Sequence, residues 1–372
     1  MAKLHTVYQL TITTISPLHI GTGNKLRRDY DYVTHRGKTW VIDSSALAEM
    51  LYERDHRDFE QMAAGAPAAN LIHPDEFKED SPLFRYVLQG EPRAQARGSE
   101  IQEQIKDPWD RPYIPGSSLK GALRTALAVI GAQQRQVPIR PAALNRDSRF
   151  AAQPLEQEVL NAAGTPRGKI PNYDLLRALQ ISDSTPAEGP SLQLLNAQVT
   201  TGQKHGSPIE LEAIPRGVTF TATLTLDGFL LRKSTRSKLG WGDDQRKWLR
   251  NIARVANYFT LYRLEQERER WEGINAPIRS FYQKEFRRRI DESSEFFLQL
   301  GWGGGWDSKT FGLLLSDGAV FSQLVSIYGK QLIRHGKYEV GDRFPKTRRV
   351  VIRKDKPAQP FGWIHVKMER IQ

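Results

Sequence analysis

Alternating apolar and polar positions predict several strands along the chain. Residues 7–15 alternate as in a half-buried strand, and residues 16–23 follow as a predicted loop. Residues 29–33 and 39–42 flank a His-Arg-Gly-Lys turn and predict a hairpin. Residues 217–226 alternate strictly, so they are the most strongly predicted strand of the chain.

Apolar residues that recur every three or four positions predict helices. One helix begins near Ser117, and its predicted buried residues are Leu119, Leu123, Ala126, Leu127 and Ile130. A long amphipathic helix is predicted over residues 243–271, with a packing stripe made of Trp248, Ile252, Val255, Phe259 and Tyr262. A shorter helix, capped by Asp43 or Ser44, is predicted to end near Tyr52.

Two polar stretches interrupt this pattern. Residues 53–105 predict a helical insertion, and residues 135–171 predict a second insertion of irregular surface loop. The pattern changes from strands to long helices near residue 230, so we expect an N-terminal domain over 1–230 and a more helical domain over 231–372. Strands and helices together make the expected fold class α+β.

The composition narrows the classes of partner and of chemistry. Lys and Arg number 54 against 42 Asp and Glu, and the net charge of +12 favours a polyanion such as nucleic acid, although an unrelated basic enzyme would share this composition. The absence of cysteine excludes disulfides, thiolate zinc sites, iron–sulfur clusters and a cysteine nucleophile, and it fits a cytoplasmic protein.

Two further classes find no support in the sequence. The amino terminus lacks the apolar block of a signal peptide, and no run approaches the ~20 apolar residues that span a bilayer. The eight histidines have no metal-ligand spacing. We therefore expect no metal, no cofactor and no membrane partner.

The segment IPGSSLKGALRTAL (114–127) places a turn before the first of these helices. Gly116 lets another backbone approach, Ser117 or Ser118 can cap the helix, and Lys120 and Arg124 lie one turn apart. With the free N–H groups of the first turn, these residues predict an anion pocket. An ordinary capped helix with a solvated basic face is the alternative. The segment lacks the Lys and Ser or Thr of a Walker A loop, so ATP is not implied.

The segment GWGGGWDSKT (301–310) interleaves glycines with two tryptophans. A bare backbone permits positive φ and close approach of a ligand, and a lysine can meet a phosphate. The predicted RNA contacts of this loop are Gly303, Gly304, Gly305 and Lys309. Trp302 and Trp306 could stack on bases or fill the core. We expect this segment and 114–127 to converge on one ribose–phosphate strand.

Residues 16–28 bring a histidine and basic residues together after the first strand. His19 could act as the general base of a ribonuclease, because the imidazole pKa lies near neutrality, or it could hydrogen-bond to RNA. No second acid or base can be placed beside it, so no catalytic residue is assigned. Lys25 and Arg27 are predicted RNA contacts.

A basic segment near the C-terminus, PKTRRVVIRKDK (345–356), holds six basic residues and one acid. Lys346, Arg348 and Arg349 are predicted to follow an RNA backbone. The alternative is a solvated edge strand that its charges keep soluble. The three consecutive arginines at 287–289 are interpreted as a solvated helix face.

In this order, the motifs resemble the RAMP superfamily of CRISPR proteins. The resemblance lies in ITTISPLHIGTG (12–23), YIPGSSLKGALRTAL (113–127), LQISDS (179–184), the glycine-rich loop (301–310), FPKTRR (344–349) and PFGWIHVKM (360–368). The last two elements narrow it to the subunit that caps the 3′ end of the guide RNA in the type III-A (Csm) effector complex. The two insertions carry no pattern of the family.

The resemblance implies a ferredoxin-like (RRM-like) RAMP core with helical insertions, followed by a second, more helical domain. It also implies CRISPR RNA as ligand, with a repeating backbone RAMP subunit and a small helical subunit as neighbours in an antiviral complex. The implied role is non-enzymatic support of crRNA maturation. The alternative is a metal-independent CRISPR repeat endoribonuclease, with His19 as base and Lys309 near the scissile phosphate.

Overall fold

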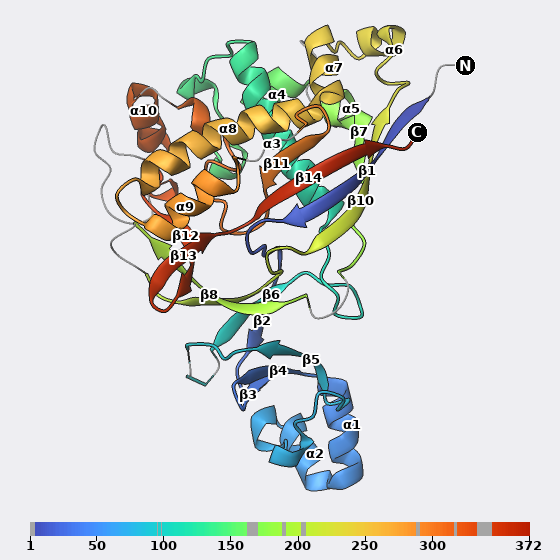
Figure 1. The fold of residues 1–372 in the computed structure, drawn as a ribbon, viewed down its shortest axis with the longest axis vertical. Coiled ribbons are helices and arrows are strands. Elements are labelled where there is room, and N and C mark those ends of the chain that lie inside the picture. The colour runs from blue at the N-terminus through green and yellow to red at the C-terminus, as the bar shows by residue number, and fades with distance from the viewer. Residues whose placement is uncertain are drawn as a thin grey trace.

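The computed structural model is a mixed α+β structure, with a large main body and a small lobe that projects from it (Figure 1). It describes residues 4–94, 96–97, 99–161, 170–187, 191–201, 206–287, 291–315, 318–332 and 344–372. The predicted fold class, α+β, is confirmed at this level.

The first sheet runs through the middle of the main body. Its order is β11 (Glu295–Gln299), β14 (Trp363–Arg370), β1 (His5–Thr14), β10 (Thr219–Asp227) and β7 (Leu179–Ile181), and all neighbours are antiparallel. Along β10 buried residues alternate with more exposed ones, because successive side chains point to opposite faces of a sheet. The strands predicted over 7–15 and 217–226 are confirmed.

Helices α3 (Gly116–Gln134) and α8 (Ile252–Trp271) pack on this sheet and on each other, and α7 (Asp243–Arg250) packs on both helices. The five residues predicted for the buried face of α3 are all buried, which confirms that helix. The single helix predicted over 243–271 is wrong. It breaks at Asn251, whose φ of −112° and ψ of 38° are not helical, and Tyr262 is 40% exposed rather than buried.

The second sheet lies below the first and joins the main body to the small lobe (Figure 1). Its order is β13 (Lys356–Pro360), β12 (Arg348–Arg353), β8 (Gln193–Thr200), β9 (Ile209–Ala213), β6 (Glu100–Gln104) and β2 (Gly21–Arg27). Residues 21–23 therefore begin a strand, although the sequence predicted a loop there. The edge-strand alternative for 348–353 is also wrong, because β12 pairs with strands on both sides.

The small lobe comprises β3 (Tyr32–His35), β4 (Lys38–Ile42), α1 (Ser44–Arg54), α2 (His56–Ala63) and β5 (Phe84–Gln89). The predicted hairpin is confirmed by the β3–β4 pairing, and Asp43 caps α1 by accepting hydrogen bonds from the amides of residues 45 and 46. The helical insertion predicted over 53–105 is only partly right, because it contains strands β5 and β6 as well as α2.

The remaining helices are α4 (Gln153–Leu160), α5 (Ile170–Tyr173), α6 (Lys233–Lys238), α9 (Ala276–Lys284) and α10 (Gly318–Tyr328). Helix α4 lies within 135–171, where the sequence predicted irregular loop; residues 162–169 of that stretch and residues 288–289 of the arginine run lie outside the described residues. The division into domains at residue 230 stays a prediction, and both large sheets combine strands from either side of it.

Helix α3 offers a matched pair of glycines that tests its packing. A Cβ at Gly116 would meet the carbonyl oxygens of Ile181 and Ser182, whereas a Cβ at Gly121 would meet nothing within 4 Å. We expect Gly116→Ala to lower the free energy of unfolding by about 1–3 kcal/mol. Gly121→Ala should instead raise it by up to about 1 kcal/mol, because alanine is the better helix former. Denaturant unfolding of both variants measures this, and equal effects would contradict the packing described here.

Candidate nucleic-acid interface

The glycine-rich loop follows β11, and its own packing requires its glycines. Gly301, Gly303 and Gly305 have φ values of 66°, 92° and 77°, in the region that favours glycine. A Cβ at Gly301 would meet the carbonyl oxygen of His19, and one at Gly303 would lie 2.7 Å from the Cβ of Phe361. The glycines of this loop therefore do allow a close approach, and what approaches them is His19 and Phe361 of the same chain.

A buried ion network holds the loop in place. Arg348 of β12 donates from Nε to Glu267 of α8 at 2.7 Å and from Nη2 to Asp307 of the loop. Arg263 of α8 donates from Nη2 to the carbonyl oxygen of Gly304 at 3.2 Å. All four charged side chains are buried. Burial alone would raise the pKa of Glu267, but the guanidinium groups of Arg348 and Arg263 more than offset it and the pKa is lowered.

This network corrects the assignment of Arg348 to RNA. The residue is 6% exposed and is paired with two carboxylates, so it has no free donor group to offer at the surface. The sequence contained a signal for it: Arg263 and Glu267 continue the buried stripe of α8 at a spacing of four residues. A charged residue on an apolar stripe indicates a buried partner.

Cations line the outer side of the same loop. Arg349, the neighbour of Arg348 on β12, places its guanidinium 4.7 Å from the centre of the Trp302 ring. Partial burial, and to a smaller extent the charge of Arg349, lowers the pKa of Lys309. Lys309 and Lys346 are exposed, and Lys309 makes no ion pair with any described residue. The neighbouring cations Lys309 and Arg349 favour the approach of an anion.

The two tryptophans differ in their surroundings. Trp306 packs edge-on against Phe344, with ring centres 4.9 Å apart, so it serves the core. Trp302 lies edge-on to Phe361 and His19, at 5.4 and 6.2 Å, and its ring also carries the guanidinium of Arg349. Both are half-buried. Trp302 therefore supports the cationic surface from below.

His19 is buried rather than presented to a ligand. It is 3% exposed, and its Nδ1 lies 2.6 Å from the carbonyl oxygen of Glu212. Burial lowers the pKa of His19, and the hydrogen bond to the Glu212 carbonyl opposes this only in part. The side chain thus packs between the loop and β9, which corrects its assignment as an RNA contact. The carbonyl oxygen of His19 accepts a hydrogen bond from the amide of Trp302, at 2.8 Å.

The predicted anion pocket at the start of α3 is occupied by a carboxylate of the protein, that of Asp183. The amide of Gly116 donates to the Asp183 carboxylate at 2.7 Å. Arg124 forms ion pairs with Glu156 at 3.0 Å and with Asp174 at 2.8 Å. Ser117 is exposed, and Ser118 and Lys120 are half-buried. Burial lowers the pKa of Lys120, partly opposed by Asp174. The predicted serine cap is wrong, because the helix begins at Gly116 after Pro115 and no side chain caps it. The basic face is not simply solvated either, because Arg124 is paired with two carboxylates. RNA contact by this segment stays a prediction.

The two segments expected to converge lie apart. Gly116 lies against Ser182, whose amide donates to the carbonyl oxygen of Thr223 on β10, and Thr223 is opposite Gln9 of β1. The glycine-rich loop follows the end of β11 opposite Trp363, whose carbonyl oxygen accepts a hydrogen bond from the amide of Ile15. Gln9 and Ile15 are six positions apart along β1 and the residue that follows it, about 20 Å of extended chain. The segments also flank opposite edges of the sheet, β7 and β11. The expectation that they meet at one point is wrong.

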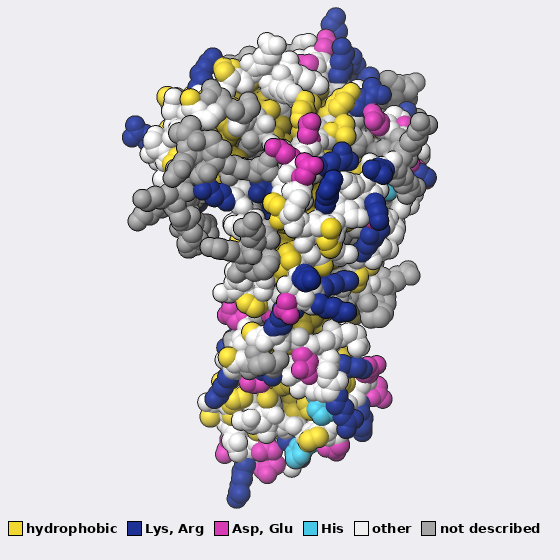
Figure 2. Space-filling view, turned by 60° about the vertical axis from the view of Figure 1, so that its left-hand side comes forward, with side chains coloured by type: hydrophobic (Ala, Val, Ile, Leu, Met, Phe, Trp, Pro, Cys, Tyr) yellow, Lys and Arg dark blue, Asp and Glu magenta, His cyan; other side chains and the backbone are white. Residues whose placement is uncertain are grey.

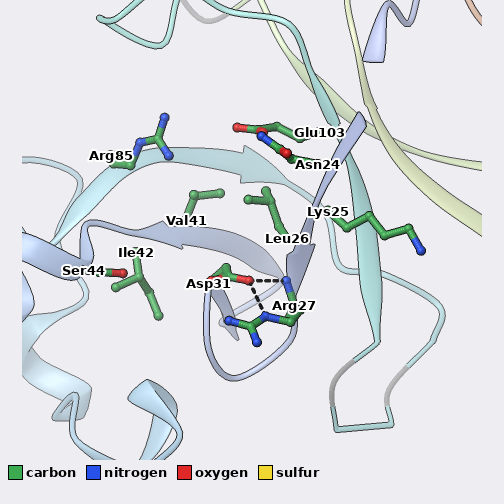
Figure 3. A pocket seen from close by; sticks show the side chains of 10 residues that line it. All are labelled: Asn24, Lys25, Leu26, Arg27, Asp31, Val41, Ile42, Ser44, Arg85 and Glu103. Carbon is green, nitrogen blue, oxygen red and sulfur yellow. Dashed lines mark hydrogen bonds and ion pairs between the residues drawn. The ribbon is translucent and has the colours of Figure 1, made fainter. Parts of the chain in front are cut away.

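Lys25 and Arg27 lie on β2, on the far edge of the second sheet from β12 and β13. They line a cavity of about 450 Å³ between β2 and the small lobe, with apolar Leu26 and Val41 (Figure 3). Lys25 pairs with Glu100, and Arg27 pairs with Asp31 of the same cavity. Figure 2 shows Lys and Arg side chains gathered at the narrow junction between the main body and the small lobe.

The described residues contain no cluster of three or more His, Cys, Asp or Glu side chains that could hold a metal ion. In the same ranges, no helix is both long enough and apolar enough to cross a membrane. What the interface offers is cations on a rigid support.

A family model, the RAMP superfamily, matches residues 11–317. The chain belongs to the RAMP superfamily. Curated relatives of this RAMP protein carry the name CRISPR system Cms protein Csm5. The protein of Mycobacterium tuberculosis is 25% identical over 82% of this chain and 83% of the relative. The protein of Streptococcus thermophilus is 27% identical over 61% of this chain and 66% of the relative. The protein of Methanocaldococcus jannaschii is 26% identical over 69% of this chain and 62% of the relative.

Solved structures agree with the family. A chain of a type III-A Csm–crRNA–target RNA ternary complex superimposes on this RAMP protein with a TM-score of 0.67 and 25% identity, over 97% of this chain and 100% of the other. Csm5 of T. onnurineus superimposes with a TM-score of 0.66 and 21% identity, over 95% and 99%, and shares the fold. The match therefore includes the regions of both sequence insertions.

Arg348 and Arg349 form a matched pair of neighbours on β12. Arg348→Met should lower the free energy of unfolding by about 3–5 kcal/mol, because Glu267 and Asp307 would be left buried without their partner. Arg349→Met should change it by less than about 1 kcal/mol, since Arg349 is exposed and an exposed contact with the Trp302 ring contributes little. Urea unfolding measures both. Equal stability of the two variants would contradict the buried network.

Proposed function

We propose that this RAMP protein is a crRNA-binding structural subunit of a type III-A CRISPR effector complex, where it caps the 3′ end of the crRNA and supports its maturation. Its similarity to curated Csm5 proteins and to a chain of a Csm–crRNA–target RNA complex supports this function. The observation that carries the proposal for the site is the cationic side of the glycine-rich loop, with Lys309 and Arg349 beside Trp302.

The geometry favours contact through phosphates. Exposed cations bind a polyanion chiefly by charge and carry little sequence information. The ring of Trp302 is half-buried and its face is covered by Arg349, so the guanidinium is the group presented outward. Lys346 is exposed two residues before Arg348 and would add a further cation, and Lys25 and Arg27 would give a second contact at the junction with the small lobe.

A ferredoxin-like core belongs to the same proposal. The chain order β1, α3, β7, β10, α8 and β14, with the sheet order β14-β1-β10-β7, supports two interleaved β-α-β units in an antiparallel sheet. Helices α6 to α10 all follow residue 230, which supports the proposed second, more helical part of the chain.

The proposed partners are crRNA, the repeating backbone RAMP subunit and a small helical subunit of the same complex. The proposed role is non-enzymatic. The burial of His19 supports this, because a general base must lie within hydrogen-bond reach of the proton that it removes.

The loop site predicts a change in salt dependence. Lys309→Ala/Arg349→Ala should weaken binding of the crRNA at low salt by roughly 10-fold or more per cation. It should also flatten the plot of log affinity against log salt by about 0.7 per cation. Fluorescence anisotropy over a KCl series measures both quantities. The control is Arg57→Ala/Lys78→Ala, which removes two exposed cations from the small lobe. Identical slopes for the two double variants would sink the loop site.

The ribonuclease alternative predicts a product that the structural role does not. We expect labelled CRISPR repeat RNA to remain intact with the purified wild-type protein in EDTA, although it binds. His19→Ala should then show no loss of cleavage, since there is none to lose. Gel electrophoresis of the RNA reads this out, with hydroxide-treated RNA marking the cleavage ladder. Cleavage by the wild-type protein that His19→Ala abolishes would establish the alternative.

A further inference from the structure

The helices α7 and α8 carry an uninterrupted run of positive charge. Residues 245–264 contain five Lys and Arg and no acid. Arg263 belongs to the buried network and Arg246 lies 3.7 Å from Asp243. The other three, Lys247, Arg250 and Arg254, are exposed and make no ion pair with any residue that the structure describes. These three cations take no part in the buried ion network that holds the glycine-rich loop.

Two exposed tyrosines and an exposed leucine continue this run along α8. Tyr258 and Leu261 are 44% and 54% exposed, and Tyr262 is 40% exposed. They follow Arg254 by four, seven and eight residues, so they share one face of the helix with it. The face points away from the sheet, because Asn257, Thr260 and Arg263 on the other side bond β11 and the loop. Figure 1 shows α8 on the outside of the helical layer.

The start of α8 adds to the positive potential. Its first turn holds no acidic residue, and no side chain caps it. Arg254 lies in that turn, where the helix dipole disfavours a cation. The positions of Lys247 and Arg250, in the last turn of α7, bring two more positive charges to the same break at Asn251. A bound anion would offset these charges, and none of the three cations forms an ion pair with a described residue.

We propose that the α7–α8 stripe (Lys247, Arg250, Arg254, Tyr258, Leu261 and Tyr262) binds single-stranded nucleic acid, separately from the glycine-rich loop. The cations hold phosphates and the exposed tyrosine Tyr258 stacks on a base, the combination that single-strand binding surfaces use. Tyr262 is steadied by Gln133, which donates a hydrogen bond to its hydroxyl oxygen. An acidic protein would match the cations but would gain nothing specific from a stacking ring, so nucleic acid is the better fit.

The test uses the full-length protein with the loop site disabled by Lys309→Ala/Arg349→Ala. The probe is a labelled oligouridine of about 20 nucleotides, read by anisotropy at low salt. Adding Arg250→Ala/Arg254→Ala should weaken its binding about tenfold or more, and adding Tyr258→Ala about fivefold or more. The control, Arg57→Ala/Lys78→Ala in the same background, removes equal charge and should change binding less than twofold. Thermal unfolding midpoints confirm that each variant is folded.

Heparin, a polyanion without bases, separates charge from stacking. Tyr258→Ala should leave heparin binding unchanged while weakening oligouridine. If Tyr258→Ala binds oligouridine as the background protein does, or if the stripe and control variants lose equal affinity, the proposal is overturned; the first of these results would favour an acidic protein partner. Because the loop is disabled throughout, failure of the stripe leaves the proposed crRNA site untouched, and failure of the loop in its own salt series leaves the stripe untouched.

Discussion

The buried pairing of Arg348 with Glu267 and Asp307 is the interaction on which the interface depends. It joins three segments that lie far apart in sequence: helix α8, the glycine-rich loop and strand β12. Three glycines of this loop have positive φ and bring no side chain to anchor it, so its anchors are Trp302, Trp306 and Asp307. Placing its one acid in a salt bridge inside the protein fixes the loop far more firmly than a surface pair would.

The same pairing decides what the surface presents. Successive residues of a strand point to opposite faces, so burial of Arg348 turns Arg349 outward over Trp302. The loop then adds Lys309 close enough for Arg349 to lower its pKa. The cations of this surface are therefore carried on a backbone that the buried pairing holds in place. The glycines are needed inside, where His19 and Phe361 leave no room for a Cβ.

The sequence predicted what local pattern determines. Strict alternation identified β10, and helical spacing identified the buried face of α3, because one face of each element is covered by the same core. Strands β5 and β6 were missed, since they lie in polar sequence and are stabilised by pairing with β4, β2 and β9. The break at Asn251 was missed because the apolar spacing continues across it.

The candidate site shows the same limit. The motifs marked the glycine-rich loop as the candidate, but spacing could not show that the amide of Gly116 already donates to the Asp183 carboxylate. It also could not separate Arg348 from Arg349, which are identical side chains at adjacent positions. Only the partner across the core distinguishes them: a carboxylate for one, solvent and an aromatic face for the other. The two arginines of one dipeptide thus have different physical roles.

Charge is segregated between the small lobe and the rest of the chain. Between residues 43 and 83 the small lobe has ten acidic and three basic residues, so the rest of the chain is more positive than the net charge of +12 indicates. A polyanion is attracted to the main body and repelled by the tip of the small lobe, within the screening length of about 8 Å at physiological salt. An RNA strand that approaches the junction between them, where Lys25 and Arg27 lie, is therefore directed toward the main body rather than along the lobe.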